Sequence, residues 1–122
     1  MRMRTGRYGF TIVELMIVVA VIGLLITLAI PSFVKSRDTA QLNTVYNNLR
    51  AIETAKDQWA LDNKKGTGDA TDLPVLSDYL KGGTIKPVLN EVYESNQIGS
   101  PPYAVAHVRL GTYAPTDPIS IP

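Results

Sequence analysis

An uncharged apolar run near the N-terminus governs how this chain can fold. Twenty residues from Leu15 to Val34 contain no charged side chain. The stretch from Phe10 to Ile30, read as a helix, spans roughly 31 Å at about 1.5 Å per residue, which matches a bilayer's hydrocarbon thickness of about 30 Å. The run therefore predicts a membrane-spanning helix.

The charges around this run predict its orientation. Three arginines (Arg2, Arg4 and Arg7) precede it, and the next basic residue is Lys35. Positive charge favours the cytoplasmic side, which places the short N-terminus in the cytoplasm and the rest of the chain outside. Without the first nine residues, nine bases remain against eleven acids, a net charge of −2. A basic nucleic-acid-binding body is therefore not indicated.

Glu14 is an acidic residue at the start of this otherwise apolar segment. An ionised carboxylate costs about 2.5–3.5 kcal/mol at the centre of a membrane helix and less near an end, so we expect it to have a partner. A cut between Gly9 and Phe10 would place a new α-amine one helical turn from Glu14. That amine would be largely protonated at neutral pH, because its pKa is about 7.7–8.0. The cut would create a counter-ion.

This N-terminus resembles that of a known family. A short basic leader ends in Gly9 and is followed by Phe10-Thr11-Ile12-Val13-Glu14 and the apolar helix, which is similar to the class III signal of type IV pilins and of the pseudopilins of type II secretion. The resemblance implies that a prepilin peptidase cleaves after Gly9 and N-methylates Phe10. It implies that Glu14 pairs with the Phe10 amine of a neighbouring subunit. The implied partners are identical or related subunits in a helical filament, with the apolar helices as its core, and an inner-membrane assembly platform.

Gly23 and Pro31 lie where members of that family often carry residues that loosen the helix. Proline lacks a backbone N–H, so Pro31 is expected to kink or locally melt the helix. For Gly23, a second interpretation is that a small residue lets neighbouring helices approach closely.

Two other interpretations of the N-terminus are open. An ordinary secretory signal has an apolar core of about 7–15 residues and a small-x-small cleavage site, a role that Thr27-Leu28-Ala29 would have to fill. An uncleaved single-pass anchor also explains the length of the run. The excess length and Glu14 argue against the first, while the second leaves Glu14 and the Gly9-Phe10 junction unexplained.

The segment from Val34 to about Asn63 has no proline or glycine and shows helical spacing. We expect one helix from about Phe10 to Lys64, with Gly66 at its C′ position and a stripe that the rest of the chain covers. The stripe consists of Leu42, Val45, Leu49, Ile52 and Trp59, with Ala51, Ala55 and Ala60 beside it. Charged residues fall mainly off the stripe: Lys35, Arg37, Arg50, Lys56, Asp57 and Asp62.

The remaining residues predict a small head. Residues 71–83 contain a capping residue, an early proline and a final Gly-Gly, which favour a short helix with its body at residues 75–80. Pro87–Tyr93 and Tyr103–Val108 are predicted strands, and the proline-rich tail is expected to be extended. These elements would form a two- or three-stranded antiparallel sheet lying on Trp59.

The predicted fold class is α+β, with a long N-terminal helix, half in the membrane and half amphipathic, and a small C-terminal antiparallel β head. The expected divisions are a leader at 1–9, a transmembrane or filament-core helix at 10–34, an amphipathic helix half packed on the head at 35–65, and the head at 66–122. This arrangement resembles the lollipop shape of the pilin family.

Few chemistries are open to the head. With no cysteine and one histidine, a structural zinc site, a disulfide and a thiol nucleophile are excluded or implausible. His107 has Ser100 and Ser120 as candidate nucleophiles, yet no nucleophile elbow or oxyanion motif accompanies it. No metal or other cofactor is expected, because the acids match no EF-hand pattern and fit solvated loops. The candidate calcium ligands are Asp69, Asp72 and Asp117, with Asp78 and Glu91.

The function these features predict is a structural subunit of a pilus-like filament, not an enzyme, and specifically a pseudopilin of a type II secretion-like system. The short chain without a disulfide favours that over a type IV pilus subunit acting in adhesion, motility or DNA uptake. The alternative from another class is a single-pass membrane-anchored extracytoplasmic binding protein. The expected location is the inner membrane, with the N-terminus cytoplasmic and the head outside, and then a periplasmic or surface filament.

Overall fold

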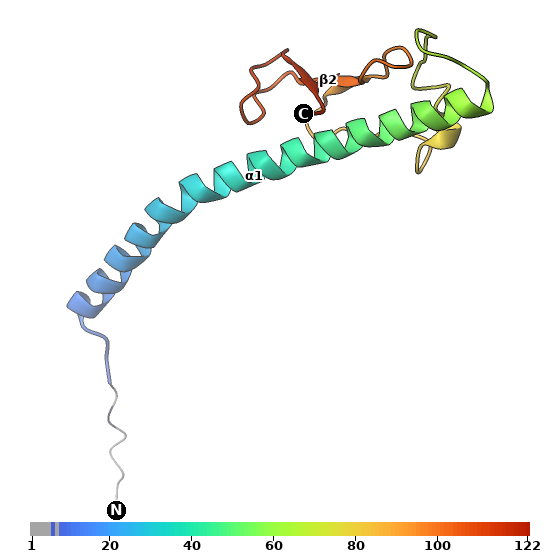
Figure 1. The fold of residues 1–122 in the computed structure, drawn as a ribbon. Helices are drawn as coiled ribbons and strands as arrows, with labels where there is room; N and C mark the ends of the chain where they lie inside the picture. Colours follow the sequence, from blue (N-terminus) through green and yellow to red (C-terminus); the bar gives the residue numbers. More distant parts are fainter. Residues whose placement is uncertain (1–5, 7) are drawn as a thin grey trace, which may run out of the picture. The chain divides into compact units, whose positions relative to one another are not determined.

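The computed structural model describes Gly6 and residues 8–122, so most of the predicted leader, including its three arginines, lies outside the described residues. A long helix, α1 (Ile12–Asp62), is followed by a short 3-10 helix, η1 (Ser77–Tyr79), and by three strands, β1 (Val92–Glu94), β2 (Tyr103–Val105) and β3 (Pro118–Ser120) (Figure 1). The predicted α+β fold, a long N-terminal helix followed by a small antiparallel sheet, is confirmed. The chain divides into two compact units, Met1–Lys35 and Ser36–Pro122, and each is described by itself.

The residue at the C′ position of α1 is Lys64 and not the expected Gly66. Lys64 adopts a positive φ of 53°, Lys65 N donates to Ala60 O at 2.8 Å and Lys64 N donates to Leu61 O at 3.4 Å. This pair of bonds is a Schellman motif, which places Lys64 at C′. The prediction that Gly66 occupies C′ is therefore wrong. Gly66 N instead donates to an Asp69 carboxylate oxygen in the next turn.

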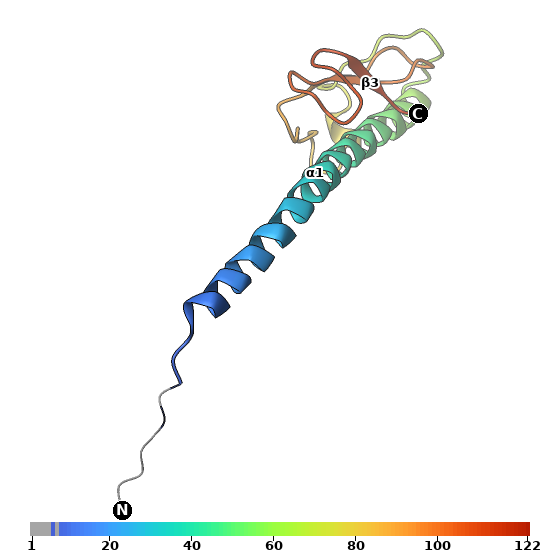
Figure 2. The same cartoon turned by 90° about the vertical axis from the view of Figure 1, so that its left-hand side faces the viewer.

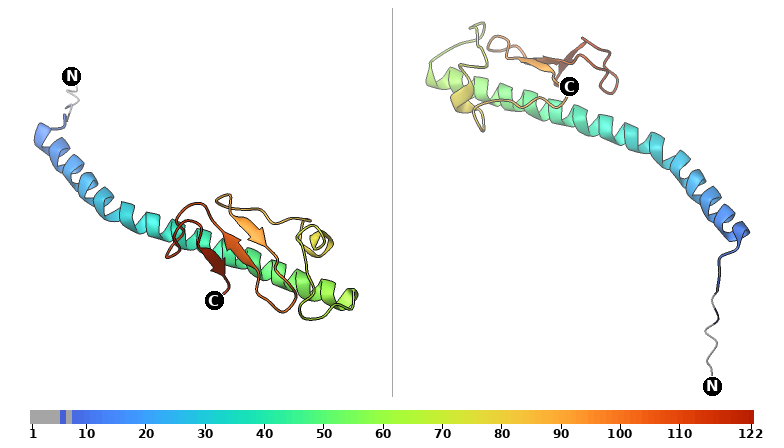
Figure 3. Two further views of the ribbon diagram at one scale, coloured as in Figure 1. Left: turned by 90° about the horizontal axis from the view of Figure 1, so that it is seen from above. Right: turned by 180° about the vertical axis from the view of Figure 1, so that it is seen from behind.

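The three strands form an antiparallel sheet in the order β1-β2-β3, with β2 in the centre (Figure 3). Tyr93 pairs with Ala104, and Ala104 pairs with Ile119. In each strand this middle residue is buried, whereas its neighbours are intermediate or exposed. Because successive residues of a strand point to opposite faces, one rung of three side chains forms the buried face of the sheet.

The unit Ser36–Pro122, called the head unit from here on, has its core between this rung and α1. Figure 2 shows the sheet over the C-terminal half of the helix. Val45, Leu49 and Ile52 are 0% exposed and belong to one cluster with the sheet rung. The predicted apolar stripe is thus confirmed at its centre. Trp59 is only partly buried against the cluster, so the sheet covers the middle of the stripe more than its end. Ala51, which was assigned beside the stripe, is exposed.

The expected helix at residues 75–80 is not formed beyond the three residues of η1. Most backbone bonds here run from residue i+3 to residue i, including Leu76 N to Leu73 O at 3.1 Å and Tyr79 N to Leu76 O at 3.0 Å, and the bonds from residue i+4, such as Leu80 N to Leu76 O at 3.1 Å, are isolated. A segment this short gains too few bonds to offset the cost of nucleating an α-helix, and consecutive tight turns replace it.

The predicted strands are shorter than expected, and Glu91 explains the first difference. Its carboxylate accepts bonds from the backbone N–H groups of Val88 at 2.9 Å and Leu89 at 2.7 Å, and from Tyr93 Oη at 2.6 Å. Asn90 has a positive φ of 57°. Residues 87–91 therefore form a turn around a buried carboxylate, and β1 begins only at Val92. The second predicted strand ends at Val105, and the extended tail contributes β3.

Glu91 makes the stability of the head depend on pH at acidic values. Burial would raise the pKa of this carboxyl group, but the bonds from Tyr93 Oη, Val88 N and Leu89 N outweigh burial and hold the pKa below its usual value of 4.5. A folded-state pKa below the unfolded one means that the stabilisation is complete above about pH 4.5 and is lost as the pH falls through the folded pKa.

Glu91→Gln should therefore reduce the free energy of unfolding at pH 7 by about 1–3 kcal/mol, because a neutral amide replaces an acceptor of several bonds. The difference from the unsubstituted chain should shrink as the pH falls below 4.5, in urea titrations at a series of pH values. The matched control is Glu94→Gln, since Glu94 is exposed. A difference that is the same at pH 7 and at pH 3 would contradict this account.

Candidate functional site

The start of α1 carries a closed set of hydrogen bonds between Thr11 and Glu14. Thr11 N donates to Glu14 Oε2 at 3.0 Å, Thr11 Oγ1 donates to the same oxygen at 3.2 Å, and Glu14 N lies 3.2 Å from Thr11 Oγ1. The N-cap carbonyl of Thr11 accepts a bond from Leu15 N at 3.3 Å. This geometry is a capping box, in which an N-cap threonine and a glutamate three residues later bond each other's backbone N–H groups.

The capping box gives Glu14 a partner within its own chain. The sequence predicts a partner for this carboxylate in the amine released by a cut before Phe10, whereas the uncut chain satisfies it through Thr11. Thr11 is thus a residue of the site that sequence reasoning missed. The sequence does predict this role, because a Thr-x-x-Glu pattern just before an apolar run is the signature of a capping box.

Gly9 and Phe10 lie immediately before the helix and are exposed. A Cβ built on Gly9 would meet nothing within 4 Å, and Phe10 is 84% exposed. The helix begins at Ile12 rather than at Phe10, because Thr11 acts as its N-cap. The predicted cleavage junction is therefore an accessible, non-helical segment, as the active site of a peptidase requires of a substrate.

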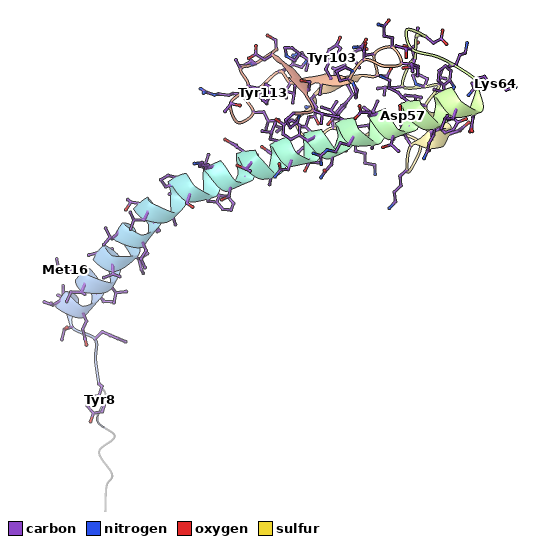
Figure 4. The ribbon with its side chains drawn as sticks, viewed as in Figure 1. Tyr8, Met16, Asp57, Lys64, Tyr103 and Tyr113 are labelled. Atoms are coloured by element: carbon purple, nitrogen blue, oxygen red, sulfur yellow. The ribbon has the colours of Figure 1, made fainter. Side chains whose placement is uncertain are left out.

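The apolar side chains that follow are exposed on every side of the helix. From Phe10 to Val34, the large apolar residues are 49–84% exposed, and Figure 4 shows side chains such as Met16 projecting away from the ribbon. By length and composition this part of α1 could cross a membrane, and none of it is buried inside the chain. A helix that is apolar all round needs lipid or other apolar helices around it.

Gly23 and Pro31, the predicted kink positions, both lie inside α1. α1 continues through both residues without interruption. A kink or local melting at Pro31 stays a prediction. A Cβ on Gly23 would meet nothing within 4 Å, which leaves open the interpretation that a neighbouring helix approaches there.

The candidate calcium ligands do not form a common site among the residues that the structure describes. Asp69 Oδ2 accepts a bond from Gly66 N at 2.9 Å, and Asp117 Oδ2 accepts one from Ala114 N at 3.0 Å. Asp72 is exposed. Across the described positions, no three or more His, Cys, Asp or Glu side chains gather closely enough to hold a metal ion. The observed role of Asp69 and Asp117 is to close turns, and calcium binding stays untested.

His107, the histidine considered above as a catalytic candidate, lies just beyond β2 and is exposed.

Comparison with known proteins identifies the family. Residues 4–30 match the family described as the prokaryotic N-terminal methylation motif. The type II secretion system core protein G of Klebsiella michiganensis is 34% identical over 62 residues, 51% of this chain and 44% of the relative. The protein of the same name from Escherichia coli (strain K12) is 30% identical over 96 residues, 70% of this chain and 66% of the relative. The type IV major pilin protein PilA of Myxococcus xanthus is 44% identical over 59 residues, 44% of this chain and 27% of the relative. The chain belongs to the type IV pilin and pseudopilin family.

The names of these relatives are those of a type IV pilin and of type II secretion core proteins. The matched segments of this chain span between 27% and 66% of the length of these three relatives. No solved structure matches it. Among the residues that the structure describes, one helix is long and apolar enough to cross a membrane, which is consistent with a single-pass, membrane-anchored pilin-family protein.

Proposed function

We propose that this chain is a pseudopilin of a type II secretion-like system. It is made as a precursor, inserted in the inner membrane with its N-terminus in the cytoplasm, and cut after Gly9 by a prepilin peptidase that also N-methylates Phe10. An inner-membrane assembly platform then transfers it from the lipid bilayer into a helical filament of identical or related subunits. The carrying observation is the accessible Gly9-Phe10 junction directly before a capped, apolar helix with exposed side chains.

The capping box suggests how the Glu14 carboxylate has a partner both in the single subunit and in the filament. In the single subunit Glu14 is satisfied by Thr11. After cleavage, the Phe10 amine of a neighbouring subunit offers a stronger, charge-assisted partner. When the Phe10 amine of a neighbouring subunit replaces Thr11 as the partner of Glu14, the filament is favoured. Before assembly, Thr11 keeps the Glu14 carboxylate from lying in the membrane without a hydrogen-bond partner.

A pseudopilus is favoured over a type IV pilus by the extent of the similarity. The relatives similar over 88 and 96 residues are type II secretion core proteins, whereas the type IV pilin PilA is similar over 59 residues. Deleting the gene in its host separates the two candidates. Loss of protein secretion supports the pseudopilus, and loss of surface pili with normal secretion supports the pilus.

The test of maturation is the intact mass and N-terminal sequence of the protein from native membranes. We expect a chain that begins at N-methylated Phe10. A chain that begins at Ile30 would indicate an ordinary secretory signal and a released head. A chain that begins at Met1 or Arg2, in a host that has the peptidase, would indicate an uncleaved anchor. Either of these two results would contradict the proposal and favour a secreted or anchored binding protein.

A further inference from the structure

Lys56 is a charged residue buried in the head unit, although its position in the sequence predicts an exposed side chain. It lies on α1, is 3% exposed, and donates from Nζ to three backbone carbonyl oxygens, those of Ser95 at 2.7 Å, Gln97 at 2.9 Å and Ser100 at 2.7 Å. An ammonium group has three N–H donors, and here each has an acceptor. The geometry matches the charged form, because a neutral amine would turn a lone pair toward one of these oxygens.

These carbonyls belong to the 95–100 loop, which forms most of the connection between β1 and β2. Several of its bonds run to residues 66–71. Ile98 N donates to Asp69 O at 2.9 Å, Gly68 N donates to Ile98 O at 2.9 Å, and Ser95 Oγ donates to Thr71 O at 2.6 Å. These bonds join two loops to each other. Lys56 joins the pair to α1.

The fit between the two loops is close at Gly99. This residue has a φ of 83°, which a larger residue rarely adopts, and a Cβ built on it would lie 2.6 Å from Thr67 Cγ2, so that the Thr67 side chain or the loop would have to shift. The two loops are therefore in direct contact at this position, next to the carbonyls that Lys56 contacts.

The charge of Lys56 is balanced mainly by carbonyl dipoles. Residues 95–100 contain no titratable side chain. The one acid in residues 66–71 is Asp69, whose carboxylate accepts a bond from Gly66 N, and Glu94 precedes the loop. Burial lowers the pKa of Lys56, and Glu53 and Asp57 on exposed turns of the same helix oppose this effect. Converging carbonyl oxygens are the surroundings that proteins otherwise offer to hard cations.

We propose that the Lys56 ammonium is a tethered cation around which the 95–100 loop is ordered, in place of a free metal ion. The loop then depends on the side chain of α1 for its conformation, and this part of the head needs no dissolved cation. This role is independent of cleavage and filament assembly, so it can fail while the proposed function stands.

The first test compares Lys56→Met with the matched control Lys81→Met, since Lys81 is exposed, in the full chain in detergent. We expect Lys56→Met to lower Tm by roughly 10 °C, because one buried and two part-buried carbonyls lose their partner. The amides of Gly68 and Ile98 should exchange about tenfold faster or more, as local opening becomes easier. EDTA should leave Tm of the unsubstituted chain unchanged.

The second test is chemical rescue of Lys56→Ala, which removes three carbons and the ammonium group. n-Propylammonium chloride should restore part of the lost Tm, whereas tetramethylammonium chloride at the same concentration should not, because it has no N–H donor. Should either variant fail to fold, ¹⁵N NMR of the unsubstituted chain decides: a slowly exchanging Nζ signal of an ammonium group is expected at pH 7, and a rapidly exchanging one would overturn the proposal.

Three further results would overturn it. Lys56→Met could match Lys81→Met in both Tm and amide exchange. EDTA could destabilise the unsubstituted chain as much as Lys56→Met does, which would make a bound metal the ordering cation. Tetramethylammonium could restore the Tm of Lys56→Ala as well as n-propylammonium does, which would show that the rescue comes from ionic strength and not from N–H donors.

Discussion

Glu14→Gln subunits should enter the membrane in normal amounts and fail to form filaments. In the proposed filament, Glu14 meets the Phe10 amine of the next subunit among apolar helices, and removing one partner of a buried ion pair costs about 3–5 kcal/mol. At 1.36 kcal/mol per factor of ten, this raises the subunit concentration needed for assembly by roughly two to four decades. Membrane fractionation measures insertion, and sheared-fibre yield with electron microscopy measures assembly.

Two further variants separate the charge from the cap at the helix start. Thr11→Val removes the hydroxyl of the capping box but keeps the Glu14 charge, and loss of an N-cap costs only about 0.5–2 kcal/mol; its filaments should be fewer but present. Glu53→Gln changes an exposed glutamate elsewhere on α1 and should assemble normally. Glu14→Gln filaments at wild-type yield would show that the charge pair does not drive assembly.

The second large effect is expected in the core of the head unit. A fragment of residues 36–122 should be a soluble monomer that melts cooperatively, because this compact unit covers its own apolar stripe. In that fragment, Leu49→Ala should reduce the free energy of unfolding by about 2–5 kcal/mol, since Leu49 is 0% exposed at the centre of the cluster and truncation leaves a cavity. This is a large share of the roughly 5–15 kcal/mol that stabilises a typical domain.

Leu61→Ala is the matched control, because Leu61 lies on the same helix and is 80% exposed. It should change the stability by no more than about 0.5 kcal/mol. Urea titration followed by circular dichroism measures both variants. Aggregation of the unsubstituted fragment would show that the stripe needs neighbouring subunits, and equal effects of Leu49→Ala and Leu61→Ala would contradict the described core.

The N-terminal half of the chain could be predicted because its signals are local. The apolar run and Glu14 are adjacent in the sequence, and helical periodicity alone places Val45, Leu49 and Ile52 on one face. The sequence predicts the end of α1 to within two residues. It does not predict that Lys64 occupies the C′ position. Glycine is favoured at C′, and the bonds of the Schellman motif nevertheless place Lys64 there.

The head could be predicted only in outline, because its details depend on residues far apart in the sequence. Burial of Lys56 depends on three carbonyls some forty positions later, and a lysine beside an apolar stripe otherwise suggests an exposed side chain. Glu91 was grouped with candidate metal ligands, yet its carboxylate builds the turn that shortens β1. Strand propensity could not reveal that Val88 and Leu89 give their N–H groups to this side chain.

The order of the strands has a consequence for synthesis on the ribosome. Ile119 of β3 contributes one third of the buried rung against α1, and β3 is the last element to be translated. Val45, Leu49 and Ile52 are made long before it and cannot be fully covered until it arrives. Because contacts of such long sequence separation form slowly, the apolar stripe stays partly uncovered until the end of translation, and chaperones and proteases can reach it in that interval.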